Sequence, residues 1–200
     1  KLDPAVMVVH LGAGLAQCLG QLINVWRAGL PVVVITFAGD TGSYGDNMGL
    51  DLNHSFGPTS ISAPFTKAAW AVIEPEGLPQ AIERAFRVAK TPPVGTVHLA
   101  LYDRLLGEEH VTADVIEGGI PDLRAGYPAD SDVEELLNAL READRPLLYI
   151  GDGIWKSGAK AEATAVAEHL GIPMAGNTWD VPVWHRLHCG PIGQAVAAIS

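Results

Sequence analysis

The sequence is poor in cysteine, in positive charge and in long apolar runs. Two cysteines, Cys18 and Cys189, are too few for a disulfide framework, which fits a protein of the reducing cytosol. Lys and Arg number 13 against 23 Asp and Glu, and the net charge of −10 argues against nucleic acid or an anionic membrane as a partner. No apolar run approaches the roughly 20 residues that a membrane-spanning helix needs. We therefore expect a cytoplasmic protein that binds neither nucleic acid nor a membrane.

What the chain does have is the composition and the alternation of an α/β protein. Its 200 residues are 48% hydrophobic and 18% charged, as in globular chains. Apolar stretches alternate with helical patterns, which predicts parallel strands with crossover helices. We predict two doubly wound parallel-sheet units, residues 1–107 and 131–200, joined by a linker over 108–130. Both ends of the sequence are abrupt, so we expect a fragment of a longer protein in which both units are truncated.

The apolar periodicity also locates individual elements. In the first unit it predicts strands over 6–9, 31–37, 70–73 and 96–101 and helices over 15–28 and 76–90. A long loop over 38–62, rich in glycine and polar residues, separates the second strand from the third. In the second unit it predicts helices over 133–143 and 157–170 and strands over 146–150 and 172–175. Ser131 and Glu134 are expected to cap the first of these helices, and Gly171 is expected to end the second.

The most informative stretch joins the first strand to the first helix. The strand stops at His10, a glycine turn from Gly12 to Gly14 is predicted next, and the helix follows. A turn after a parallel strand lies at the carboxyl edge of the sheet, where open α/β folds bind ligands, and the free N–H groups of the helix face the same crevice. An isolated histidine at a strand end is usually structural, but this position makes His10 a candidate for proton transfer.

The same glycines allow a second interpretation, a dinucleotide site. Gly12 and Gly14 match the first two glycines of the fingerprint, but Gln17 stands at the third, where close helix packing needs a glycine. Asp40 follows the second strand, as a ribose-binding acid would, yet it comes late, well beyond Thr36. The match to a nicotinamide site is therefore incomplete.

Taken in order, the motifs of the chain resemble the superfamily of thiamine-diphosphate-dependent 2-oxoacid decarboxylases and acetolactate synthases, and most closely the benzoylformate decarboxylase branch. Residues 10–36, HLGAGLAQCLGQLINVWRAGLPVVVIT, are similar to the pyrimidine-binding domain of these enzymes. Further matches to that domain are Pro64–Lys67, the helix that begins at Leu78-Pro79, and Gly95–Leu99. The central domain is matched by Pro146–Ala159 and Ala167–Pro173, and by the turn over His185–Gly190.

The resemblance implies a cofactor and a reaction. Enzymes of this superfamily use thiamine diphosphate, which adds to the keto carbon of a 2-oxoacid and accepts the electrons released by decarboxylation. They form homodimers or homotetramers, because their active site is built between domains of two subunits. The glutamate that activates the cofactor is expected upstream of Lys1, and the ligands of Mg²⁺ and the diphosphate downstream of Ser200. The fragment alone is therefore expected to be inactive.

The resemblance also implies roles for residues of this chain. In the benzoylformate decarboxylase branch a histidine at the position of His10 takes part in proton transfer, whereas synthases have a small hydroxyl residue there. Gly12 and Gly14 are implied to bind the cofactor through close approach of the backbone. Leu11 and Gln17 depart from the family, where serine and asparagine are common at these positions. The resemblance therefore does not define the substrate pocket of this chain. Because central domains of the family sometimes bind FAD or ADP, a non-catalytic nucleotide-binding module for NAD, FAD or ADP is the alternative.

One pattern in the second unit imitates a metal site. Gly151-Asp152-Gly153 followed by Asn177 is similar to the motif by which thiamine-diphosphate enzymes bind Mg²⁺, but Thr178 stands in place of its second asparagine. We therefore interpret Asp152 as a turn residue and not as a metal ligand.

The remaining histidines give no stronger signal. A cluster near the end of the chain lacks a second group of ligands at zinc-like spacing; it consists of His185, His188 and Cys189. Three others are unclustered and are assigned no role: His54, His98 and His169. We predict no metal ligand in this chain.

Overall fold

The computed structural model describes residues 3–38, 59–102, 105, 107, 110–119 and 126–176. Contacts divide the chain into two compact units, Leu2–Ala125 and Gly126–Ser200. The first unit has a parallel sheet of four strands and the second a parallel pair, with helices between successive strands. The predicted α/β class with parallel-sheet units is confirmed. No helix in the described part of the chain is long and apolar enough to span a membrane.

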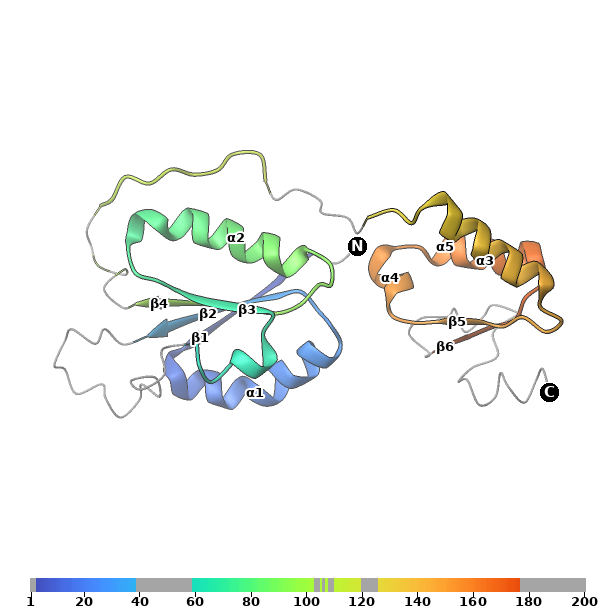
Figure 1. Cartoon of the computed structure of the whole chain (residues 1–200). Coiled ribbons are helices and arrows are strands. Elements are labelled where there is room, and N and C mark those ends of the chain that lie inside the picture. The colour runs from blue at the N-terminus through green and yellow to red at the C-terminus, as the bar shows by residue number, and fades with distance from the viewer. Residues whose placement is uncertain are drawn as a thin grey trace. The chain divides into compact units, whose positions relative to one another are not determined.

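The first unit is a parallel sheet between two helices (Figure 1). Its strands, in the spatial order β1-β2-β4-β3, are β1 (Ala5–His10), β2 (Val32–Ala38), β3 (Ala68–Val72) and β4 (Val97–Tyr102). Helix α1 (Leu11–Arg27) covers one face of the sheet and α2 (Leu78–Lys90) covers the other. Two short 3-10 helices, η2 (Ala63–Phe65) and η3 (Pro75–Gly77), precede β3 and α2.

Burial on both faces explains why the central strands are apolar apart from Thr36, His98 and Tyr102. Val33 of β2 is fully buried in one cluster with Ala85 of α2. Its neighbour Val34 is fully buried in another cluster, with Leu15 and Leu22 of α1. Successive side chains of a strand point to opposite faces, so odd-numbered residues of β2 meet α2 and even-numbered ones meet α1. Each such valine stabilises the fold by roughly 1.5–3 kcal/mol.

The described residues cover only one face of the edge strand β1. Met7 and Val9 pack into the α1 cluster, whereas Val6 and Val8 on the other face are 52% and 58% exposed. The helix on that side, α2, packs against β4, β2 and β3. By the same alternation His10 shares the uncovered face with Val6 and Val8.

Predicted and observed strands of this unit differ by one or two residues at their ends. The predicted helix over 15–28 begins too late, because α1 starts at Leu11, directly after His10. The glycine turn predicted at Gly12 to Gly14 is therefore wrong: these residues form the first turn of α1. Most of the loop predicted over 38–62 lies outside the described residues.

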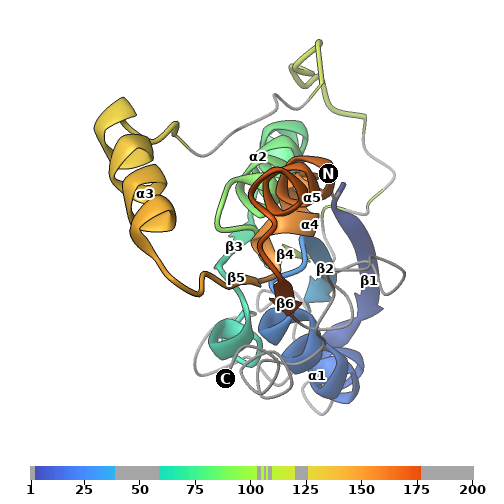
Figure 2. The ribbon, with the colours of Figure 1, turned by 90° about the vertical axis from the view of Figure 1, so that its right-hand side faces the viewer.

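The second unit places helices around the strand pair. Its elements are α3 (Asp130–Glu142), β5 (Leu148–Ile150), α4 (Gly153–Ser157), α5 (Lys160–Leu170) and β6 (Met174–Gly176). Strands β5 and β6 pair in parallel, and Ile150, Ala167 and Met174 form their buried core with α5. Helix α3 has no buried residue and lies to one side of α4 and α5 (Figure 2).

The prediction that Ser131 and Glu134 cap α3 was wrong. The helix begins before Ser131, so that serine lies inside it. The N–H of Ala129 donates to the carboxylate of Asp132 at 3.3 Å. Asp132, and not Glu134, therefore accepts the capping hydrogen bond. The acceptor is the side chain three positions after the cap residue, because that position reaches back over the first turn.

The helix predicted over 157–170 is divided into α4 and α5. Gly158 ends α4 with φ at 78°, in the left-handed region that favours glycine. Gly171 ends α5 with φ at 66°, as predicted for the end of this helix. Glycines in the left-handed conformation therefore set both helix ends.

Replacing Gly171 by alanine is expected to destabilise the second unit by roughly 1–2 kcal/mol. A Cβ added at Gly171 meets no atom within 4 Å, so the cost comes from the left-handed backbone alone. The measurement is urea unfolding followed by circular dichroism. Gly153→Ala is the matched control, because it also adds a Cβ in open space but at a helical residue of α4. Equal stability of the two variants would contradict the prediction.

Candidate functional site

His10 lies at the carboxyl end of β1, where the strand passes directly into α1. Its backbone is extended, with φ at −91° and ψ at 124°, and it pairs in register with Phe37 of β2. The side chain is exposed, does not cap α1 and has no hydrogen-bond partner among the described residues. Both ring nitrogens are therefore available to a group outside the described residues.

The first turn of α1 presents glycine beside this histidine. A Cβ added at Gly14 would lie 3.8 Å from the Cβ of Val9, which is an ordinary contact. The fold itself therefore does not require glycine at position 14. Gly12 belongs to the same turn. The structure thus places the three predicted site residues together, at the junction of β1 and α1.

A second polar group is buried on the face of the sheet that α1 covers. His98 of β4 is fully buried, with 0% of its surface exposed. Its Nε2 lies 2.7 Å from Oγ1 of Thr36 on β2, and its Nδ1 lies 2.7 Å from Oγ of Ser62. The hydroxyl of Ser62 in turn donates to the backbone carbonyl of Thr59 at 3.1 Å. Thr36 and Ser62 are themselves buried, so the network is closed to water.

This chain of hydrogen bonds determines where the proton of the ring resides. The Ser62 hydroxyl gives its only proton to the Thr59 carbonyl, so it accepts a hydrogen bond from Nδ1 of His98. Nε2 is then the unprotonated nitrogen, and the Thr36 hydroxyl donates to it. Burial lowers the pKa of His98 from 6.5 to about 4, because the charged ring would lose its hydration. His98 is therefore a neutral imidazole near pH 7.

His98 was assigned no role from the sequence, and the structure gives it a structural one. The sequence did hold a signal, because His98 interrupts an otherwise apolar strand, VHLALY. A strand buried on both faces must pair any polar side chain that it carries. The partners were not foreseeable, since Ser62 and Thr36 lie 36 and 62 positions away in the sequence.

In the second unit Asp152 lies at the start of α4, in a turn as predicted. Its carboxylate is 3.2 Å from Nζ of Lys156, one helical turn further on. The described part of the chain brings together no group of three or more His, Cys, Asp or Glu side chains able to hold a metal. Several residues considered from the sequence lie outside the described residues: Asp40, His54, Asn177, Thr178, His185, His188 and Cys189.

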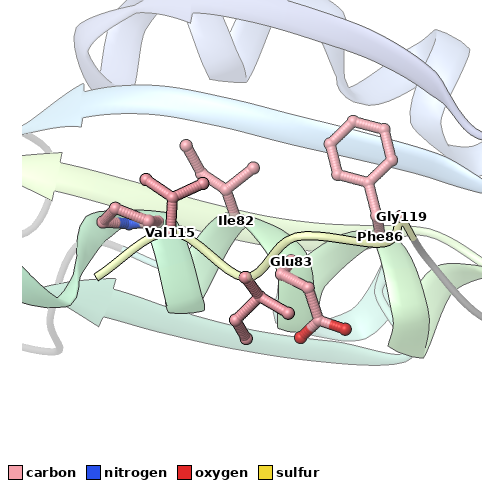
Figure 3. Close-up of a pocket in the computed structure, with 7 residues that line it drawn as sticks. Ile82, Glu83, Phe86, Val115 and Gly119 are labelled. Atoms are coloured by element: carbon pink, nitrogen blue, oxygen red, sulfur yellow. The ribbon is translucent and has the colours of Figure 1, made fainter. Parts of the chain in front are cut away.

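Residues 110–119 cross α2 and form with it a shallow cavity of about 380 Å³ that is largely open to solvent (Figure 3). Its walls are mainly apolar and include Ile82 and Phe86 of α2 and Val115 of the crossing segment. Glu83 is the titratable residue that lines it, and Glu83 is paired with Arg87 at 3.5 Å. Because it offers no unpaired catalytic group, this cavity is a weaker candidate for an active site than the β1–α1 junction.

Comparison with known proteins identifies relatives for both units. Residues 133–195 match the model of the thiamine pyrophosphate enzyme central domain. The chain is 30% identical over 198 residues to the acetolactate synthase large subunit of Corynebacterium glutamicum, covering 94% of this chain and 30% of that protein. It is 27% identical over 207 residues to the benzoylformate decarboxylase of Pseudomonas aeruginosa, covering 98% of this chain and 38% of that protein. The chain thus spans about a third of the length of these relatives.

Solved structures share the fold. The benzoylformate decarboxylase of Polynucleobacter necessarius matches 94% of this chain and 35% of its own, with a TM-score of 0.81 and 24% identity. A thiamine diphosphate-dependent 4-hydroxybenzoylformate decarboxylase of Rhodococcus jostii matches 94% of this chain and 36% of its own, with a TM-score of 0.70 and 19% identity. At these identities the likeness establishes the fold.

Replacing Thr36 by valine is expected to lower the free energy of unfolding by roughly 1–3 kcal/mol, because Nε2 of His98 would be left buried without a donor. Valine keeps the branched shape of threonine, so the strand and its packing are preserved. Urea unfolding near neutral pH measures the effect. Thr112→Val is the matched control, because Thr112 is exposed in the same unit. The network assignment fails if the two variants are equally stable.

Proposed function

Because this chain is related over nearly its whole length to the thiamine-diphosphate-dependent decarboxylases and synthases, we propose that it is part of an enzyme that decarboxylates or carboligates 2-oxoacids. The enzyme would use thiamine diphosphate with Mg²⁺ and act in the cytoplasm as a homodimer or homotetramer. In this proposal residues 1–107 form most of a pyrimidine-binding domain, residues 108–130 a linker, and residues 131–200 the beginning of the central domain.

The proposal rests on one observation, the continuity of the match across both units. A domain shared with otherwise unrelated proteins would match over one unit alone. Here single alignments cover 94% and 98% of the chain, and the two units follow each other in the order of the relatives. Shared order over two units supports a shared architecture and, with it, a shared type of active site.

The described residues fit one wall of such a site. His10 offers an imidazole that has no hydrogen-bond partner among the described residues, and Gly14 lies next to it in the first turn of α1. Mg²⁺ and a diphosphate call for several carboxylate and amide oxygens around the metal, and the described residues bring no such set together. We propose that these ligands come from another part of the protein.

Each residue at this wall would have its own role in binding the cofactor or in proton transfer. When bound, thiamine diphosphate would supply the nucleophilic carbon and the electron sink. His10 would give or take a proton at a ring nitrogen beside the reacting group, since an imidazole does both near neutral pH. Gly12 and Gly14 would let the backbone of α1 approach the cofactor. The exposed face of β1, with Val6 and Val8, would be covered by the rest of the protein, which would exclude water from His10.

The geometry does not favour the alternative, a nucleotide-binding module for NAD, FAD or ADP. A dinucleotide fingerprint needs a glycine loop between strand and helix, but α1 follows β1 without a loop. At the second glycine turn α4 has only five residues, and the Asp152 carboxylate at its start is paired with Lys156, so the turn has no net positive charge. Neither turn has the shape or charge of a phosphate cradle.

The chain by itself is expected to turn over neither benzoylformate nor pyruvate when supplied with thiamine diphosphate and Mg²⁺, because only one wall of the site is present. The release of CO₂ measures turnover, and the full-length protein serves as the positive control. Calorimetric titration of the chain with NAD, FAD and ADP completes the test. Turnover by the isolated chain would overturn the proposed division of the site, and tight nucleotide binding would favour the module.

In the full-length protein His10→Ala is expected to lower kcat for 2-oxoacid decarboxylation by roughly 100- to 10,000-fold, the usual range for a lost general acid or base. Binding of thiamine diphosphate should persist, because the backbone of α1 is unchanged. His169→Ala, an exposed histidine in the last turn of α5, is the matched control and should leave kcat unchanged. A His10→Ala enzyme with undiminished kcat would remove His10 from the proposed mechanism.

A further inference from the structure

Residues 59–66, here called the strap, cross the α1 side of the sheet and lead to β3. The strap holds its own shape through local backbone hydrogen bonds, from Ser62 to Thr59 at 3.3 Å, Ala63 to Ser60 at 3.4 Å and Phe65 to Ser62 at 2.9 Å. These bonds lie within the strap. They shape the strap but do not attach it to the sheet.

Two kinds of contact attach the strap to the rest of the unit. Ile61 and Phe65 pack into the α1 cluster, and the ring of Phe65 meets Trp26 edge to face at a centroid distance of 6.5 Å. Among the described residues the polar link between strap and sheet is the 2.7 Å hydrogen bond between Ser62 and His98. The strap therefore covers the histidine and is held by it.

The elements around His98 carry no carboxylate that could stabilise a positive charge on the ring. This holds for α1, β1 to β4 and the strap, whose sequences contain no Asp or Glu. The titratable or charged residues that these elements and the residue after the strap contribute are His10, Cys18, Arg27, Lys67 and Tyr102. The Nζ of Lys67 is engaged with the carbonyls of Val88 and Thr91 at the end of α2. Among the described residues, a protonated His98 would thus be buried without a counter-charge.

We propose that the strap is an acid-released cover: when it lifts, water reaches His98, the ring takes a proton from solvent, and the strap cannot close again until that proton leaves. No bond other than N–H forms or breaks, and the proton returns to solvent on closing. This device is independent of the proposed enzymatic function.

The direction and size of the effect follow from proton linkage. In the closed state burial lowers the pKa of His98 to about 4, and in the open state the ring regains its ordinary value of 6.5. The open state therefore binds more protons as the pH falls from 6.5 toward 4, so closure is fully stable above this window and weakens through it. Between about pH 7.5 and about pH 5 the opening constant should rise roughly 30-fold.

The opening should be local. Strand β2 pairs with β1 and β4, and β4 pairs with β2 and β3, so both remain in the sheet when the strap lifts. Among the described residues, opening breaks one hydrogen bond between strap and sheet and the apolar contacts of Ile61 and Phe65. Segments with few buried contacts open at lower cost than the core.

Amide hydrogen exchange of the chain at about pH 7.5 and about pH 5, corrected for intrinsic exchange rates, tests the proposal. Protection in the strap should fall roughly 30-fold in acid, while β2 and β4 keep theirs. His98→Asn places an amide N–H where Nδ1 was and does not titrate, so its strap protection should not depend on pH. His169→Asn, at an exposed position, should behave as the wild type.

The proposal is overturned if amide protection of the wild-type strap is the same at both pH values. It is also overturned if β2 and β4 lose as much protection in acid as the strap does, because that would indicate global unfolding. An unchanged acid response in His98→Asn overturns it as well. If that variant does not fold, the proposal is tested on the wild type alone. The two readouts are then the loss of amide protection in the strap compared with β2 and β4, and the ¹⁵N chemical shifts of the His98 ring. These should report the neutral ring with its proton on Nδ1 at both pH values, and a ring that is charged while the strap is protected would refute the proposal.

Discussion

Burial of β2 and β4 on both faces is the constraint on which the first unit depends. With α1 on one side and α2 on the other, the middle residues of these strands, such as Val34 and His98, are closed off from water. Any polar group there must find its partner inside the protein, because an unpaired one costs more than a hydrogen bond returns. His98 meets this requirement through Thr36 and Ser62, and the same burial keeps its ring neutral.

The two described histidines of this sheet have opposite environments. His98 lies in a central strand, fully buried and with both ring nitrogens paired, whereas His10 ends an edge strand, is exposed and has no hydrogen-bond partner among the described residues. A residue that exchanges protons with a substrate must be reachable and must not be committed to a structural bond. This contrast makes His10 the candidate for chemistry and His98 the candidate for holding the strap.

Much of the fold was predictable because burial leaves a periodic trace in the sequence. The strand over 31–37 and the helix over 76–90 were located to within a few residues, since the apolar positions repeat with the period of each element. The glycine turn at Gly12 to Gly14 was misjudged, because glycine permits a turn without requiring one. The cap of α3 was misplaced because the helix begins at Asp130, before Ser131, so that Asp132 and not Glu134 stands three positions after the cap residue.

The sequence by itself determined the α/β class, the likeness to thiamine-diphosphate enzymes and the place of His10 at the end of a strand, because apolar periodicity and the order of motifs can be read along a single chain. Only the tertiary structure decided that His98 is buried and neutral, that Ser62 closes over it and that β1 keeps one face uncovered. These features depend on segments far apart in the sequence. Side-chain pairing across a sheet leaves no periodic signal in one sequence, so it becomes visible only when the strands are brought together.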